Sequence, residues 1–197
     1  MITHACFVTS IRPKTLTRNI SFARQLLSLK GISYGFVGER ASLLFARQLV
    51  ADLDGRVFRV PKEGKILYHL ACVFASNYSV VLLGAVQQLV RGFTRNNGLK
   101  HFERLMSTSL ENALSVSPSK ALTGPIVRGS MQTIRMHLHE LKKKNKDLLP
   151  LYRSLGMIAL SLASKQKRLS KKQVHQMRKM LRSRSALSTD FMGLRNK

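Results

Sequence analysis

The chain has few acidic residues and few cysteines. Its 197 residues include 9 Asp and Glu against 34 Lys and Arg, which gives a formal net charge of +25. A chain with so little counter-charge repels itself and binds polyanions non-specifically at low salt. The 2 cysteines, Cys6 and Cys72, supply neither a disulfide framework nor a metal-binding spacing. Because this usage is compatible with a reducing cytosol, we expect a cytoplasmic protein.

The sequence also lacks the short motifs of common catalytic and metal sites. It contains no P-loop, no zinc pair and no Ser/His/Asp order. His137 and His139 are too close together to bind a metal as residues i and i+4 of a helix, and no Glu-x-x-His string accompanies them. We interpret both histidines as surface residues.

Charge is absent from a long stretch in the middle of the chain. No charged residue occurs from Leu70 to Val90, and apolar side chains cover nearly every face of a helix built from this stretch. Such a helix is either enclosed by protein or spans a membrane. The polar notch at Ser76 and Asn77, and the lack of a second candidate span, favour the enclosed helix and predict no membrane span. The notch is either satisfied by neighbouring backbone or faces a ligand.

Before this stretch, the apolar pattern alternates between strand and helix. It predicts strands at 2–10, 31–38 and 56–60, and a helix at 39–53. A strand, a helix and a second strand in this order form a βαβ unit. The acid-free segment 1–38 resembles a transit peptide, or it is the interior of a domain whose true start lies upstream.

After the stretch, the pattern is helical. It predicts one helix at 99–114, a second that begins after Ser130 and a third at 147–163. We expect Ser130 to cap the second helix, and we expect a Gly/Pro-bearing connection at 121–129. The fold class is therefore mainly α.

From Lys165 onward the composition becomes strongly basic, and 170–184 could form a basic helix. We favour a solvated or frayed tail over an arm that touches RNA, DNA or an acidic membrane. The reason is that aromatic platforms for single strands are absent there except Phe191.

Several strings together resemble one family, a helical C-terminal domain of unknown function that follows Rossmann-like NAD(P)-binding domains. That family is similar to the pyrroline-carboxylate, ketopantoate and hydroxyacid dehydrogenase group, whose second domain resembles that of phosphogluconate dehydrogenase. The similarity covers about 31–163, and the third string below is its most specific part. The strings are Lys65-x-x-Tyr68-His69, Ala75-Ser76-Asn77, Ala121-Leu-Thr-Gly-Pro-Ile-x-Arg-Gly129 and Leu151-Tyr-Arg-x-Leu-Gly156.

The resemblance implies a helical bundle of the phosphogluconate dehydrogenase C-terminal type, preceded by a βαβ remnant of a Rossmann-like domain. We expect the remnant at 1–61, the helical domain at 62–164 and a basic tail, partly helical or disordered, at 165–197. The family fingerprint G-x-G-x-x-G, which cradles a pyrophosphate, is absent from this chain. The resemblance implies NADP or NAD as cofactor, but we expect this chain not to bind either one alone.

The resemblance also implies catalytic roles on the first long helix of the helical domain. Lys65 matches the place of a lysine that acts on the substrate carbonyl, and His69 lies four residues on, on the same helical face. A histidine that titrates near neutrality can relay a proton. The alternative is a solvated lysine and a half-buried, hydrogen-bonded histidine.

Substrate binding is expected at two further places. Thr123 offers a hydroxyl and Arg128 a planar fork for a carboxylate or phosphate, beside the turn at Gly124. Ser76 and Asn77 would face them across an interdomain cleft. The alternative is that 121–129 is merely a tight connection between two helices.

Two functions follow. The first is an NAD(P)-dependent oxidoreductase-like protein without its dinucleotide-binding half, inactive alone or one half of a split enzyme, so whether the chain itself is an enzyme stays open. Its partners would be a second copy, through the apolar helical segment, and an N-terminal Rossmann chain. The second is a basic protein that binds RNA or a ribonucleoprotein.

Overall fold

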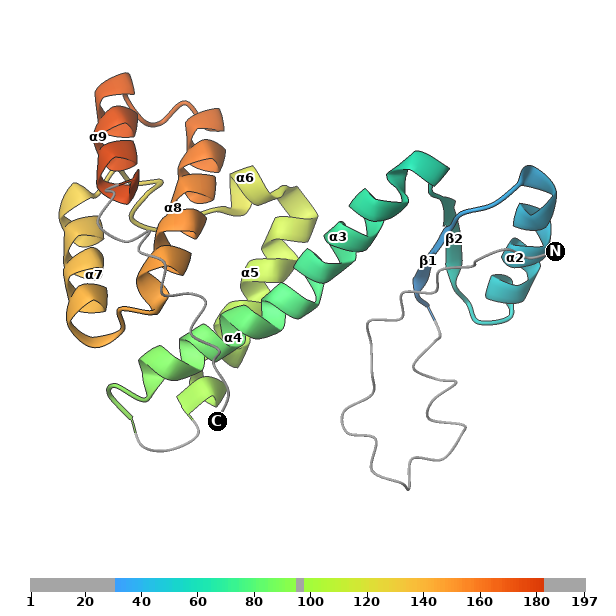
Figure 1. Cartoon of the computed structure of the whole chain (residues 1–197), viewed down its shortest axis with the longest axis horizontal. Helices are drawn as coiled ribbons and strands as arrows, with labels where there is room; N and C mark the ends of the chain where they lie inside the picture. Colours follow the sequence, from blue (N-terminus) through green and yellow to red (C-terminus); the bar gives the residue numbers. More distant parts are fainter. Residues whose placement is uncertain (1–30, 95–97, 183–197) are drawn as a thin grey trace, which may run out of the picture. The chain divides into compact units, whose positions relative to one another are not determined.

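The computed structural model describes residues 31–94 and 98–182 and is mainly helical, which confirms the predicted fold class (Figure 1). The chain divides between Gly84 and Ala85 into two compact units, each of which is described by itself. The elements in chain order are β1 (Ser33–Phe36), α2 (Arg40–Ala51), β2 (Arg56–Arg59), η1 (Lys62–Gly64), α3 (Lys65–Ala75), α4 (Asn77–Val90), η2 (Gly98–Phe102), α5 (Glu103–Val116), α6 (Pro118–Ala121), α7 (Met131–Lys144), α8 (Leu148–Lys165) and α9 (Lys171–Arg182).

The N-terminal unit contains the predicted βαβ unit. Strands β1 and β2 pair in parallel, with Ser33 opposite Arg56 and Phe36 opposite Arg59, and α2 connects them. A parallel pair needs such a crossover, because a tight turn can join only antiparallel strands. The two strands and the helix confirm the predicted elements. The strand predicted at 2–10 lies outside the described residues.

The start of α3 is fixed to this sheet by one aromatic side chain, Tyr68. Its ring meets that of Phe58 on β2 edge to face, with centroids 5.6 Å apart. The same ring lies so close to β1 that a methyl group on Gly35 would be 2.5 Å from Tyr68 Cζ. Glycine at position 35 therefore provides the space that lets α3 pack on the strands.

We expect Gly35→Ala to lower the free energy of unfolding of the N-terminal unit by about 1–3 kcal/mol, because the added methyl group overpacks a ring held on two sides. Gly84→Ala is the matched control. Gly84 lies in a helix with open space around it, so alanine there should raise stability by up to about 1 kcal/mol. Urea denaturation of both variants tests this, and equal midpoints would contradict the packing argument.

The uncharged segment folds as two consecutive helices, α3 and α4, which meet at Ser76. We predicted that protein would enclose this segment on all sides, and within the described chain that prediction is wrong. Within the segment, Val90 alone is buried. Many of its large apolar side chains are exposed, namely Ile66, Leu67, Leu70, Phe74, Tyr78, Val80, Val81, Leu82 and Leu89. The physical reason is that periodicity shows that a helix is apolar, but not which surface covers it.

By length and composition, the segment Lys62–Val90 could cross a membrane, and it is the one such helical segment in the part of the chain that the structure describes. Core helices of soluble proteins satisfy the same criterion, but they are mostly buried. This segment has no buried share in its most apolar window. The segment therefore presents an apolar surface that its own unit does not cover.

The C-terminal unit has its hydrophobic core between α7, α8 and α9. The largest fully buried side chains come from these three helices: Ile134, Leu160 and Met177. Gly156 on α8 permits a close approach of α9, since a methyl group there would lie 2.8 Å from Leu181 Cδ2. The last string of the family resemblance thus ends on a glycine that is needed for packing.

Two predicted features of this unit need correction. The interpretation of the basic tail as solvated or frayed is wrong for α9, because Met177 and Leu181 lie in the core. Ser130 does precede α7, but its hydroxyl lies 2.8 Å from the Thr133 hydroxyl and caps no backbone N–H. A neighbouring hydroxyl competes successfully with the helix end as a hydrogen-bond partner.

Candidate functional site

Lys65 and His69, the predicted catalytic pair, both lie on the first turns of α3. Lys65 is half-buried and His69 is exposed. Their spacing of four residues places them on one side of the helix, as the sequence indicated. Tyr68 packs against the sheet, so the contact that holds α3 also sets the direction in which this pair projects. Tyr68 is therefore a positioning residue. The sequence indicated it only as part of a family string and predicted no role for it.

The serine hydroxyls in and beside the polar notch at Ser76 and Asn77 find hydrogen-bond acceptors close by in the chain. Ser76 Oγ lies 2.7 Å from the carbonyl oxygen of Cys72 and 2.7 Å from Asn77 Oδ1, so its single proton has two acceptors within reach. Ser79 Oγ donates to the carbonyl oxygen of Ala75 at 3.0 Å. These bonds favour the first of the two alternatives for the notch, in which neighbouring backbone satisfies the serines. Asn77 is exposed, which leaves its amide group accessible.

The predicted connection at 121–129 is a compact turn that is partly built into the core. Gly124 adopts a φ of +102°, which favours glycine, and its carbonyl oxygen accepts a hydrogen bond from the Arg128 N–H at 3.1 Å. Ile126 and Val127 are buried in the cluster of α7, α8 and α9, whereas Thr123 and Arg128 are exposed. The turn therefore holds two polar side chains on a rigid base.

The end of this turn contacts the start of α9. Gly129 has a φ of +71°, and a methyl group on it would lie 2.5 Å from Gln173 Nε2. The Gly-Pro-Ile-x-Arg-Gly string is therefore a structural joint as well as a candidate binding loop. Arg128 is next to Gly129 in the chain, so this joint also fixes the backbone that carries Arg128.

The predicted site residues fall into two groups. Lys65, His69, Ser76 and Asn77 belong to the N-terminal unit, and Thr123, Gly124 and Arg128 belong to the C-terminal unit. Within each unit the structure places the residues as described above. The cleft expected between the groups stays a prediction.

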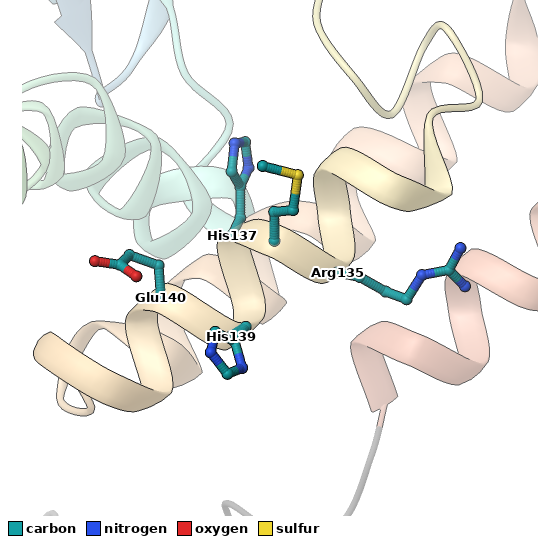
Figure 2. A pocket seen from close by; sticks show the side chains of 5 residues that line it. Arg135, His137, His139 and Glu140 are labelled. Carbon is teal, nitrogen blue, oxygen red and sulfur yellow. The ribbon is translucent and has the colours of Figure 1, made fainter.

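A shallow depression of about 600 Å³ lies along α7 (Figure 2). None of the predicted site residues lines it. Figure 2 shows its labelled side chains spreading outward from one helix instead of converging on a point. The lining residues are Arg135, Met136, His137, His139 and Glu140. A depression with walls from one helix does not enclose a ligand, so we assign it no chemistry.

Two polar contacts flank this depression. His137 Nδ1 lies 3.0 Å from the hydroxyl of Tyr152 on α8, and burial raises the pKa of that hydroxyl. Glu140 pairs with Lys144 at 2.6 Å, and the hydrogen bond from Lys144 lowers the pKa of the exposed carboxyl. His137 and His139 are both exposed, as predicted. Among residues 31–94 and 98–182, no group of three or more His, Cys, Asp or Glu could hold a metal ion.

One charged side chain was missed by the sequence analysis. Arg153 on α8 is only 8 % exposed, and its Nε has no hydrogen-bond partner in the described part of the chain. A buried cation is costly unless it is paired. Helical periodicity could have predicted that position 153 is buried. The buried residues that share one face of α8 are Leu149, Arg153, Gly156 and Leu160.

Comparisons with known proteins identify one family and one similar solved structure. The family described as a domain of unknown function, DUF2520, matches residues 32–158. Among solved structures, the chain is similar to protein TM1727 from Thermotoga maritima, with a TM-score of 0.65 and 26% sequence identity. The match covers 76% of this chain and 60% of that protein, so the chain spans about three-fifths of the length of this relative. A comparison with curated proteins gave no match. Since the family match extends over more than half of its residues, the chain belongs to the DUF2520 family.

Proposed function

We propose that this chain is the substrate-side, helical part of an NAD(P)-dependent oxidoreductase of two domains, located in the cytoplasm. The observation that supports it most is the order of its parts, a parallel βαβ unit followed by helices. The four strings that resemble the dehydrogenase group all lie within the span of the family match. The dehydrogenase relationship itself rests on that resemblance.

The dinucleotide does not fit the βα turn that the structure describes. A pyrophosphate needs glycines and free backbone N–H groups at a helix N-terminus. The turn from β1 to α2 instead presents the carboxylate of Glu39 at the N-cap position of α2. The Phe36 ring fills the space beside Gly38, since a methyl group there would be 2.7 Å from its Cζ. We therefore assign dinucleotide binding to a segment outside this chain.

The residues of this chain would then act on the substrate. A cation at Lys65 stabilises negative charge that develops on a carbonyl oxygen, and His69 on the same side of α3 offers an imidazole for proton transfer to the substrate. Thr123 and Arg128 supply a hydroxyl and a guanidinium fork on a rigid turn, which suits a substrate carboxylate. Ser76 and Asn77 remain candidates for polar contacts with the substrate.

Calorimetric titration of the chain alone with NAD and with NADP should give no binding in the micromolar range. When the chain is expressed together with a segment encoded upstream that carries G-x-G-x-x-G, binding of one dinucleotide should appear, because only that segment supplies the pyrophosphate cradle. Micromolar binding by the chain alone would overturn the assignment of dinucleotide binding to another segment. No binding by the combined protein would overturn the proposed oxidoreductase function.

We also propose that a second copy of the chain covers the exposed α3–α4 segment. Its nine exposed large apolar side chains offer an area on the order of 800 Å² per copy, which is what one partner contributes to a stable interface. Phe74 and Tyr78, whose ring centroids are 4.8 Å apart, provide adjacent aromatic anchors near the middle of the segment. The uncharged stretch also allows two chains of net charge +25 to meet without placing like charges in contact.

A further inference from the structure

The outer face of α9 carries a regular row of basic side chains. Five Lys or Arg residues and one histidine fall at helical spacing within an arc of about 120°. All six are exposed. We call them the α9 stripe: Lys171, Lys172, His175, Arg178, Lys179 and Arg182.

The opposite face of α9 is fully used by the protein core. Met177 is 0 % and Leu181 2 % exposed, and Val174 and Met180 pack against the same cluster. A helix that lies in a membrane surface needs a free apolar face to insert among the lipids. Because α9 has none to offer, it does not fit a helix that inserts among lipids.

The first turn of α9 is fixed by reciprocal hydrogen bonds. The Ser170 N–H donates to Gln173 Oε1 at 2.9 Å, and the Gln173 N–H donates to Ser170 Oγ at 3.2 Å. This is a capping box, which defines where a helix starts. The turn at Gly129 abuts the same glutamine. The stripe is therefore a rigid array about 18 Å long and not a set of independent side chains.

Acidic residues are absent from α8, from α9 and from the segment between them. From Leu148 to Arg182 the chain contains nine Lys or Arg and no Asp or Glu. No ion pair with another described residue involves any of the six stripe residues, and the buried Arg153 on the adjacent helix is equally uncompensated. Among the described residues, the surface of α9 therefore carries a strong positive potential that no ion pair offsets.

We propose that the α9 stripe binds the phosphate backbone of a double-stranded nucleic acid without base-sequence preference. Regularly spaced cations on a rigid rod match a polymer that carries one negative charge per about 1.7 Å of its axis. Single-stranded nucleic acid is a poorer fit, since it is normally held by stacking on aromatic rings, and no Phe, Tyr or Trp occurs from Arg153 to Arg182. This goes beyond the proposed oxidoreductase role and does not depend on it.

The test compares two variants of the full chain with the same change in charge. The stripe variant is Lys172→Gln, Arg178→Gln and Lys179→Gln. The control variant is Lys142→Gln, Lys143→Gln and Lys146→Gln, which are likewise exposed but lie at and beyond the end of α7. Fluorescence anisotropy with short labelled duplexes of DNA and of RNA, measured between roughly 50 and 200 mM salt, gives affinity and salt slope.

We expect the stripe variant to bind duplexes on the order of 100-fold more weakly near physiological salt, and its log–log salt slope to decrease in magnitude by roughly 2 to 3. The control variant should lose only a few-fold. Circular dichroism should show unchanged helix content in both. The DNA and RNA arms tell which duplex is the better ligand.

Three results would overturn the proposal. Equal losses in the two variants would mean that net charge alone drives binding. Tighter binding of a labelled single strand would contradict the duplex assignment. Binding to vesicles that contain phosphatidylserine, with no duplex binding, would assign the stripe to a membrane instead.

Discussion

In the dimer proposed above, replacing Leu67 and Val81 with glutamate should separate the two copies into monomers. Leu67 is 70 % and Val81 56 % exposed in the single chain, so the substitutions remove no buried contact of the monomer. By helical spacing, both fall on the side of the segment that carries Phe74 and Tyr78. In a dimer through the α3–α4 segment, each copy would bury two uncompensated carboxylates. Because desolvating an unpaired charge costs several kcal/mol, we expect the dissociation constant to rise by roughly 1,000-fold or more.

Size-exclusion chromatography with light scattering measures this directly. The matched control is Met136→Glu with Ile158→Glu, which changes two comparably exposed apolar side chains on α7 and α8 and should leave the dimer intact. A parent chain that is monomeric in buffer at micromolar concentration would contradict the interface. A chain that stays in solution only with detergent, and is monomeric there, would favour the membrane span over a second copy.

Truncating Ile134 to alanine should lower the free energy of unfolding of the C-terminal unit by about 3–4 kcal/mol. Ile134 on α7 is 0 % exposed and lies in the cluster that α8 and α9 complete. The loss combines the transfer free energy of the removed carbons with the cost of a cavity that a packed core closes only in part. Urea denaturation followed by far-UV circular dichroism should show a lower midpoint with little change in slope.

Met136→Ala is the control for this substitution because it lies two residues away on the same helix. Its side chain is 62 % exposed, so the change should alter stability by no more than about 0.5 kcal/mol. If both variants had the same midpoint, the cluster around Ile134 would not be the core of this unit. If Ile134→Ala also changed the transition of the N-terminal unit, the two units would not unfold independently.

Local pattern was enough to predict the elements near the start of the described chain. The alternation around Tyr34 and the helical period before Gly55 correctly predicted β1, α2 and β2, because a strand and a helix repeat their buried positions with different periods. The pattern could not predict that the Tyr68 ring occupies the space left by Gly35. That contact joins residues from different elements, and neither residue has an unusual local sequence.

The candidate site was predictable only as a set of residue types. The resemblance identified Lys65, His69, Thr123 and Arg128, and the structure shows which backbone holds each one. Arg153 was missed because a lone arginine in an apolar helix usually extends to solvent. Its burial depends on the close approach of α9, which Gly156 permits.

The sequence by itself determined that Leu70–Val90 is an uncharged apolar helix and that Lys171–Arg182 is amphipathic, since both are properties of composition and period. Tertiary structure alone decided their environments, and it reversed both expectations. The helical segment that was expected to be enclosed is exposed, and the helix that was expected to be solvated has Met177 and Leu181 in the core. The physical reason is that apolar side chains must leave water somewhere, but their order along the chain does not specify which surface receives them.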